Sequence, residues 1–231
     1  PAWTQLFPTG NAPSARQLAS AVVDLQHNRV LLFGGLDDLG PRHDVWALSL
    51  GAVPAWTPIA MTGPEPSDRY SQSAIYDPPH DRVVMFGGGD LFGYFGDTWS
   101  LKVTGATGQW TELSPSGSAP PARSGHSAIR DQIAGRMVVF GGWNSAQGFL
   151  NDVWTLTLSS TPGWTSIPRS GTTPVPRSLQ SAVIDPARLN LLMFGGFGSG
   201  EIPSFNDAWS LPLGDWAWSQ LAPTLDAPPS P

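Results

Sequence analysis

Four sequence markers recur along the chain with a single period of about 54 residues, and this repeat constrains the fold more than any other feature. Tryptophans separated by 53, 54, 54 and 54 positions are the first marker: Trp3, Trp56, Trp110, Trp164 and Trp218. Paired glycines close an apolar run at Gly34-Gly35, Gly87-Gly88, Gly141-Gly142 and Gly195-Gly196. An Asp-x-Trp motif begins at Asp44, Asp97, Asp152 and Asp207, and an arginine stands at Arg16, Arg69, Arg123 and Arg177. Self-similarity of this kind predicts a repeat protein, with repeats at 3–55, 56–109, 110–163 and 164–217 and a partial fifth at 218–231.

Composition removes several alternative classes. The 26 glycines and 24 prolines exclude long helices and coiled coils. The 40% of apolar residues and 11 tryptophans exclude a disordered chain. With no cysteine there is neither a disulfide framework nor a thiolate metal site. A net charge of −6 with scattered basic residues argues against nucleic-acid binding, and no apolar run is long enough to insert into a membrane.

One repeat can be read as four strands. A small-residue strand follows Arg69 and ends at Asp77, and the tight turn 78–81 leads into the apolar run 83–86. A continuously apolar run is typical of a strand buried on both faces. Strand 98–103 then alternates, and a fourth strand begins at Trp110. Four short antiparallel strands per repeat predict one propeller blade, with the first strand nearest the axis and the fourth at the rim.

This pattern resembles the kelch repeat, whose hallmarks are the glycine doublet and a tryptophan spaced after it. The resemblance covers Trp3 to Ser219, and kelch repeats have a period of about 50 residues. It implies an all-β fold: a kelch-type β-propeller of four four-stranded blades with one extra rim strand, because five rim strands are predicted to begin, at Trp3, Trp56, Trp110, Trp164 and Trp218. Because kelch propellers usually have more than four blades, three arrangements stay open. These are a tight four-bladed ring, a homodimer whose two chains complete or cap the propeller, and a segment of a larger protein.

The repeats themselves separate scaffold from site, because a residue found in every blade is explained most simply by the blade. We expect the glycine doublets to permit positive φ or close backbone approach. The four arginines should pair with carbonyls or an acidic neighbour, with a fourfold anion ring as the alternative. The Asp-x-Trp aspartates should be hydrogen-bonding residues at strand starts. In register on the inner strands stand three polar residues that we expect to line the central channel: Gln72, His126 and Gln180.

Catalytic chemistry finds little support in the sequence. Copper oxidases of the galactose oxidase kind, which also use kelch-type propellers, depend on a cysteine cross-linked to tyrosine, and this chain has no cysteine. No Gly-x-Ser-x-Gly elbow and no metal-ligand spacing occurs. We therefore expect no cofactor, no metal and no catalytic residue. A lyase or mutarotase acting through His126 and Gln180 is the enzymatic alternative.

Loops that follow the glycine doublets break the period and are rich in aromatic residues. Strand alternation puts them at the same end of the blades as the connections that precede the inner strands. Kelch proteins generally bind partners with this face, and aromatic side chains supply contact area at low entropic cost. The sequence predicts a protein partner, with a glycan as the alternative ligand. The candidate binding residues are Phe92, Tyr94, Phe95, Trp143, Phe149, Phe197 and Phe205.

The sequence leaves two cellular locations open. Abundant Pro, Trp and Gly without Cys favour a secreted or cell-surface protein of a GC-rich bacterium, but cytosolic kelch proteins also exist.

Overall fold

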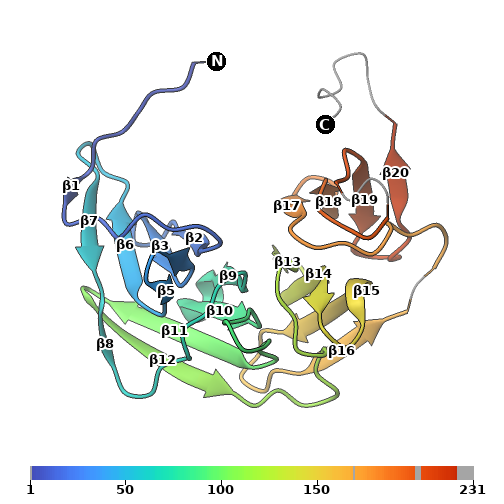
Figure 1. Cartoon of the computed structure of the whole chain (residues 1–231), viewed down its shortest axis with the longest axis horizontal. Coiled ribbons are helices and arrows are strands. Elements are labelled where there is room, and N and C mark those ends of the chain that lie inside the picture. The colour runs from blue at the N-terminus through green and yellow to red at the C-terminus, as the bar shows by residue number, and fades with distance from the viewer. Residues whose placement is uncertain (1, 169, 201–203, 223–231) are drawn as a thin grey trace. The chain divides into compact units, whose positions relative to one another are not determined.

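A computed structural model describes residues 2–168, 170–200 and 204–222. Four sheets, each with four successive antiparallel strands, form the framework of the described chain (Figure 1). Within each sheet the strands lie side by side in chain order, as predicted for propeller blades, and the all-β fold is confirmed. The helical element of the described residues is a single 3-10 turn, η1 (Pro78–His80). No helix in the described part of the chain has the length and apolar character needed to cross a membrane.

The chain divides into two compact units, and the first contains two blades. This unit comprises residues 1–93 and 98–113. Blade 1 consists of β2 (Ser20–Asp24), β3 (Arg29–Phe33), β6 (Val45–Ser49) and β7 (Ala55–Pro58). Blade 2 consists of β9 (Ser73–Asp77), β10 (Arg82–Phe86), β11 (Thr98–Thr104) and β12 (Thr107–Leu113). The short hairpin of β4 (Leu36–Asp37) and β5 (Gly40–Pro41) follows the first glycine doublet.

The second unit comprises residues 94–97 and 114–231 and holds the other two blades. Blade 3 consists of β13 (Ser127–Asp131), β14 (Arg136–Asn144), β15 (Gly148–Thr157) and β16 (Trp164–Ile167). Blade 4 consists of β17 (Ser181–Asp185), β18 (Asn190–Phe194), β19 (Ala208–Pro212) and β20 (Ser219–Leu221). The end of the predicted fifth repeat, residues 223–231, lies outside the described residues.

Each unit has one apolar core that its two blades share. The second strands supply much of it, for example through Val83 and Met85 of β10. In blades 2 and 3 these strands are buried on both faces, as their continuous apolar sequence predicted, and Val83, Val84, Met85 and Phe86 are at most 1% exposed. The phenylalanine that ends a second strand packs against the rim-strand tryptophan of the next blade. Phe33 meets Trp110 edge-on at 5.6 Å, and Phe140 meets Trp218 at 4.9 Å between ring centroids. Trp110 and Trp218 are therefore inter-blade packing residues.

The extra rim strand at Trp3 does not form. Described residues 2–8 contain no strand, and Trp3 is fully exposed. No antiparallel strand pairs with this segment in the described structure. Instead β1 (Thr9–Gly10) pairs parallel with β7 outside the rim of blade 1, just as β8 (Ala60–Thr62) pairs parallel with β12 of blade 2.

The repeated arginine, aspartate and tryptophan form one hydrogen-bonded triad in each of blades 1, 3 and 4. In blade 3 the guanidinium of Arg123 donates to both carboxylate oxygens of Asp152, at 2.6 and 2.9 Å, and to the Gly141 carbonyl at 3.0 Å. The indole of Trp154 donates to the same carboxylate at 2.7 Å. Arg16–Asp44–Trp46 and Arg177–Asp207–Trp209 repeat this pattern. These arginines thus pair with an acidic residue and a carbonyl of their own blade, as expected. The aspartates were expected to form hydrogen bonds at strand starts, and each of them also neutralises a buried cation.

The glycine doublets turn the chain where no side chain fits. Gly141 and Gly142 have φ of 66° and 100°. A Cβ on Gly142 would lie 2.8 Å from the Ser124 carbonyl oxygen and 2.9 Å from the His126 Cβ. Both halves of the expectation, positive φ and close approach, hold here.

Candidate functional site

The loops that follow the glycine doublets lie beside the segments that precede the inner strands. Backbone bridges join Gln17 to Leu36, Tyr70 to Gly89, Ser124 to Trp143 and Ser178 to Phe197. Each blade therefore has one end at which both connections meet, and we call this end the loop edge. The loops here differ between blades, from the β4–β5 hairpin of blade 1 to the long β14–β15 hairpin of blade 3.

An aromatic cluster occupies the loop edge of blade 3. Its β14–β15 hairpin continues beyond the glycine doublet, across a register shift between Phe140 and Gly142. This extension pairs Trp143 directly with Phe149 across the two strands. The Tyr94 ring packs edge-on against Trp143, with ring centroids 5.1 Å apart and an interplanar angle of 70°. Three predicted binding residues from two chain segments thus come together, each partly exposed.

Blade 4 continues this loop edge within the second unit. The Gly142 amide donates to the Arg177 carbonyl at 2.8 Å, and the Arg177 amide donates to the Leu150 carbonyl at 2.9 Å. Phe197 bridges Ser178 and is 48% exposed. Phe205 lies over the Arg177 guanidinium at 4.2 Å and so covers a structural ion pair. We call Tyr94, Trp143, Phe149 and Phe197 the aromatic loop surface.

Phe92 and Phe95 are the two remaining predicted aromatics. Phe92 belongs to the first unit and is 95% exposed, at a turn where Asp90 accepts hydrogen bonds from the Phe92 and Gly93 amides. Phe95 is partly buried, and its carbonyl accepts a hydrogen bond from the Arg123 amide at 3.1 Å. Residue type alone could not separate these two from the four that form the aromatic loop surface.

The loop edge of blade 1 is polar. Asp37 accepts hydrogen bonds from Arg42 at 2.7 Å and from Ser14 at 2.6 Å. These donors, Arg42 first, hold the pKa of Asp37 well below its ordinary value. An open cavity of about 260 Å³ lies beside it, lined by Ala15, Arg16, Gln17, Leu36, Asp37 and Asp38. Two of its charged side chains are already paired, since Arg16 binds Asp44 and Asp37 binds Arg42.

The residues predicted to line a channel are buried instead. Gln72, His126 and Gln180 are each 6% exposed. The Gln72 amide donates to the Phe33 carbonyl at 3.0 Å, and the Gln180 amide donates to the Phe140 carbonyl at 2.9 Å. Both acceptors end the second strand of the preceding blade, so these glutamines tie one blade to the next. Register placed the three residues on equivalent positions but did not show that Gln72 and Gln180 donate to the preceding blade.

A second set of charged residues, which the sequence analysis did not single out, stabilises the turns between first and second strands. Asp24 accepts from Arg29 at 2.8 Å, and Asp131 accepts from Arg136 at 2.9 Å. The same arginines reach the next blade: Arg29 donates to the Val103 carbonyl at 3.1 Å and Arg136 to the Leu213 carbonyl at 2.8 Å. A recurring Asp and Arg five positions apart was the signal available in the sequence.

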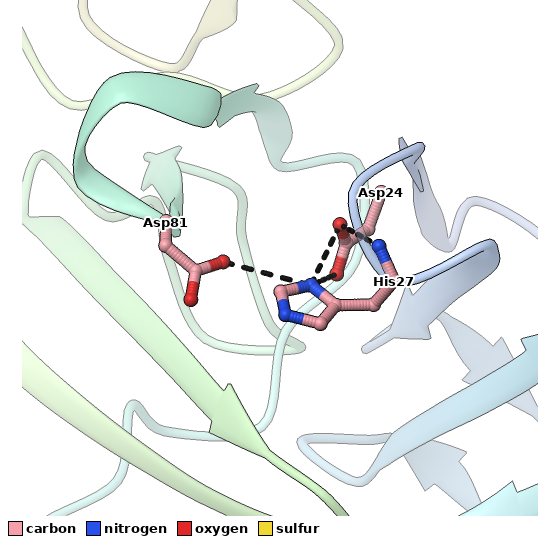
Figure 2. Close-up of side chains that lie close together, drawn as sticks. All are labelled: Asp24, His27 and Asp81. Carbon is pink, nitrogen blue, oxygen red and sulfur yellow. Dashed lines mark hydrogen bonds and ion pairs between the residues drawn. The ribbon is translucent and has the colours of Figure 1, made fainter.

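One cluster of potential metal ligands occurs among the described residues, at the turn of blade 1 (Figure 2). It contains Asp24, His27 and Asp81, with His27 Nδ1 lying 2.8 Å from Asp24 Oδ2 and 3.6 Å from Asp81 Oδ1. Burial would raise the pKa of Asp24, but hydrogen bonds from Arg29, Tyr76 and His27 hold it below its ordinary value. Tyr76 also donates to Asp81 at 2.8 Å. These contacts make the cluster a hydrogen-bonded turn.

Comparison with known proteins decides the family. The model of the KLHDC2/KLHL20/DRC7 Kelch-repeats domain matches residues 1–109 and again residues 103–231. The chain belongs to the kelch-repeat family. Its four sheets are kelch blades in a β-propeller arrangement, and the doublets, triads and rim tryptophans described above are the internal contacts of those blades.

Similar curated proteins include kelch-containing regions of much longer chains. The chain is 29% identical over 204 residues to host cell factor homolog hcf-1 of Caenorhabditis elegans, which covers 79% of this chain and 25% of that protein. It is 34% identical over 174 residues to multiple epidermal growth factor-like domains protein 8 of Rattus norvegicus, covering 73% and 6%. It is 32% identical over 195 residues to putative adagio-like protein 2 of Oryza sativa subsp. japonica, covering 81% and 29%. The chain thus spans less than a third of each of these relatives.

Proposed function

We propose that this kelch chain is a non-catalytic recognition module that binds a protein partner through its aromatic loop surface. The observation that carries the proposal is the packing of Tyr94 against Trp143, with Phe149 paired beside them and Phe197 exposed on the next blade. Large, partly exposed aromatics held on a rigid hairpin resemble interface hot spots, since they bury area at little entropic cost. The family supports this reading, because kelch propellers serve mainly as protein-interaction domains.

The polar residues of the blades support recognition over catalysis. Arg123 and Arg177 are fully buried and bound to Asp152 and Asp207, which leaves no charged pair open to a substrate at those positions. Gln180, offered above as a residue of a lyase or mutarotase site, donates its amide hydrogens to Phe140 and Ser127. An active site needs titratable groups that reach a cleft, and these groups serve the packing of blades.

A specific feature favours a protein over a glycan. Sugar recognition combines an aromatic platform with free polar groups, and the polar side chain nearest Trp143 is that of Asn144. Asn144 is 5% exposed, and its carbonyl oxygen accepts from the Ala146 and Gln147 amides at 3.1 and 2.8 Å. Its amide donates to the Gln147 side chain. The Asn144 side chain beside Trp143 is therefore occupied by hydrogen bonds within the hairpin.

The test is selection of a 12-residue peptide display library on the full chain, followed by binding measurements with the recovered peptides. We expect peptides with large apolar side chains whose affinity falls at least tenfold for Trp143→Ala. Trp3→Ala is the matched control, because Trp3 is a fully exposed tryptophan away from the loop edges, and binding should be unchanged. Peptides that bind the Trp143→Ala and wild-type chains equally would overturn the proposal.

A further inference from the structure

The sheet faces of blades 1 and 4 differ from their counterparts inside the units. Within each unit, one face of the first blade packs against the blade that follows it in the chain. We call this the forward face of a blade. It carries Val22 and Phe33 in blade 1 and Ile129 and Phe140 in blade 3, all at most 6% exposed. The equivalent residues of blade 4 are Val183 and Phe194, which are 60% and 43% exposed. Blade 4 thus exposes two large apolar side chains at positions that are buried in blades 1 and 3.

Blade 1 has exposed apolar residues on the opposite face, which we call the back face. The back faces of blades 2 and 4 pack against the shared cores, where Ala74 with Tyr76 and Ala182 with Ile184 are partly buried. The equivalent residues of blade 1 are Ala21 and Val23; both are exposed, Val23 by 51%. Trp56, the counterpart of the buried Trp110 and Trp218, keeps part of its surface exposed as well.

We propose that the forward face of blade 4 docks on the back face of blade 1 of a second copy of this chain. The contacts already present within each unit show what occupies such a face. Phe33 and Phe140 are covered by the rim tryptophan of the following blade, Trp110 and Trp218. In the proposed contact Phe194 takes the place of Phe140, and Trp56 of the second copy takes the place of Trp218. Each copy has one face of each kind, so two copies offer two such contacts.

Two side chains that form hydrogen bonds between blades within a unit are replaced in this contact, which makes it weaker than the contacts within a unit. The glutamine that reaches the preceding blade, Gln72 or Gln180, is replaced in blade 1 by Ala19. The arginine that reaches the following blade, Arg29 or Arg136, is replaced in blade 4 by Asn190, which occupies the same register opposite Asp185. Apolar burial remains while these hydrogen bonds are lost, so the dimer should dissociate on dilution.

The experiment is light scattering of the full chain across a concentration series, with single aspartate substitutions on each face. We expect the mass to rise with concentration from 24.6 kDa towards twice that value. Val183→Asp and Val23→Asp should each shift the midpoint to at least tenfold higher concentration. Because both side chains are largely exposed in the single chain, neither change should affect folding, which tryptophan fluorescence checks. Ile133→Asp, an exposed apolar position on a turn of blade 3, is the control and should leave association unchanged.

Mixing the two variants sharpens the test. A Val183→Asp chain keeps a wild-type back face, and a Val23→Asp chain keeps a wild-type forward face, so the mixture can form one intact contact. It should associate more strongly than either variant alone. A wild-type mass of one chain at every concentration overturns the proposal. Association that neither substitution weakens overturns it too, because the copies would then meet through another surface.

Discussion

At the scale of single residues, the buried Arg–Asp–Trp triads of blades 1, 3 and 4 are costly to disturb. Arg123 is fully buried, and Asp152 neutralises it through two hydrogen bonds. Asp152→Asn would leave an uncompensated buried cation, so we expect a loss of about 3 kcal/mol in the free energy of unfolding. Urea denaturation of the variant and the wild-type chain measures this loss in the free energy of unfolding. Asp38→Asn, at an exposed position of the β4–β5 turn, is the control and should change stability by less than about 0.5 kcal/mol.

The same carboxylates set how stability depends on pH. Burial would raise the pKa of Asp152 and Asp207, but hydrogen bonds from Arg123 and Arg177 outweigh it and hold both below the ordinary value of 3.8. The unfolded chain then binds more protons than the folded chain, so stability is complete above about pH 5 and falls as the pH drops through the folded values. Urea midpoints at pH 7, 4 and 3 should decrease in that order. The decrease should be smaller in Asp152→Asn, and an equal decrease in both proteins would contradict this account.

Sequence reasoning succeeded where a residue's role lies within its own blade. The period of Arg123 and its equivalents predicted a structural arginine with a carbonyl or acidic neighbour, and the structure supplies both. It reached less far for Gln72 and Gln180, because strand register says which positions are equivalent but not which backbone carbonyl each side chain reaches. The pairing of Tyr94 with Trp143 was equally hidden, since loops outside the periodic part of the repeat carry no register.

At the scale of elements, covered and uncovered faces of equivalent strands should differ in what they contribute to stability. Phe140 and Phe194 end the second strands of blades 3 and 4, yet one is fully buried and the other is 43% exposed. Phe140→Ala should cost about 3–5 kcal/mol through lost transfer energy and a cavity beside Trp218. Phe194→Ala should cost about 1 kcal/mol when the chain is dilute enough to be a monomer. Chemical denaturation of the two variants compares them, and similar losses would mean that Phe194 is covered within the single chain.

The strand count shows where element prediction reaches its limit. Four strands per repeat follow from periodicity, alternation and the buried apolar run, and all four sheets have that order. Trp3 carries the marker of a rim strand but forms none, because a rim strand exists only when a third strand lies beside it. Local sequence therefore predicted which segments are able to form strands, whereas pairing decided which of them do.

At the scale of the whole molecule, the two units, each of two blades, present different chemistry at their loop edges. The first unit shows paired charges around Asp37, and the second shows the aromatic loop surface. The family and fold could be predicted from the sequence because the kelch markers recur in register along the chain. The binding surface could be predicted only as a list of loop aromatics, since contacts between distant loops decide which of them gather.

The most direct test of recognition by the aromatic loop surface is the indole ¹⁵N spectrum of the 11 tryptophans, recorded during titration with a display-selected peptide and, separately, with a panel of oligosaccharides. The peptide should shift the Trp143 resonance while the buried Trp110, Trp164 and Trp218 stay in place. Movement of Trp143 with an oligosaccharide alone would assign the surface to a glycan. An unchanged Trp143 in the presence of a bound peptide would contradict the central claim that this surface recognises a protein.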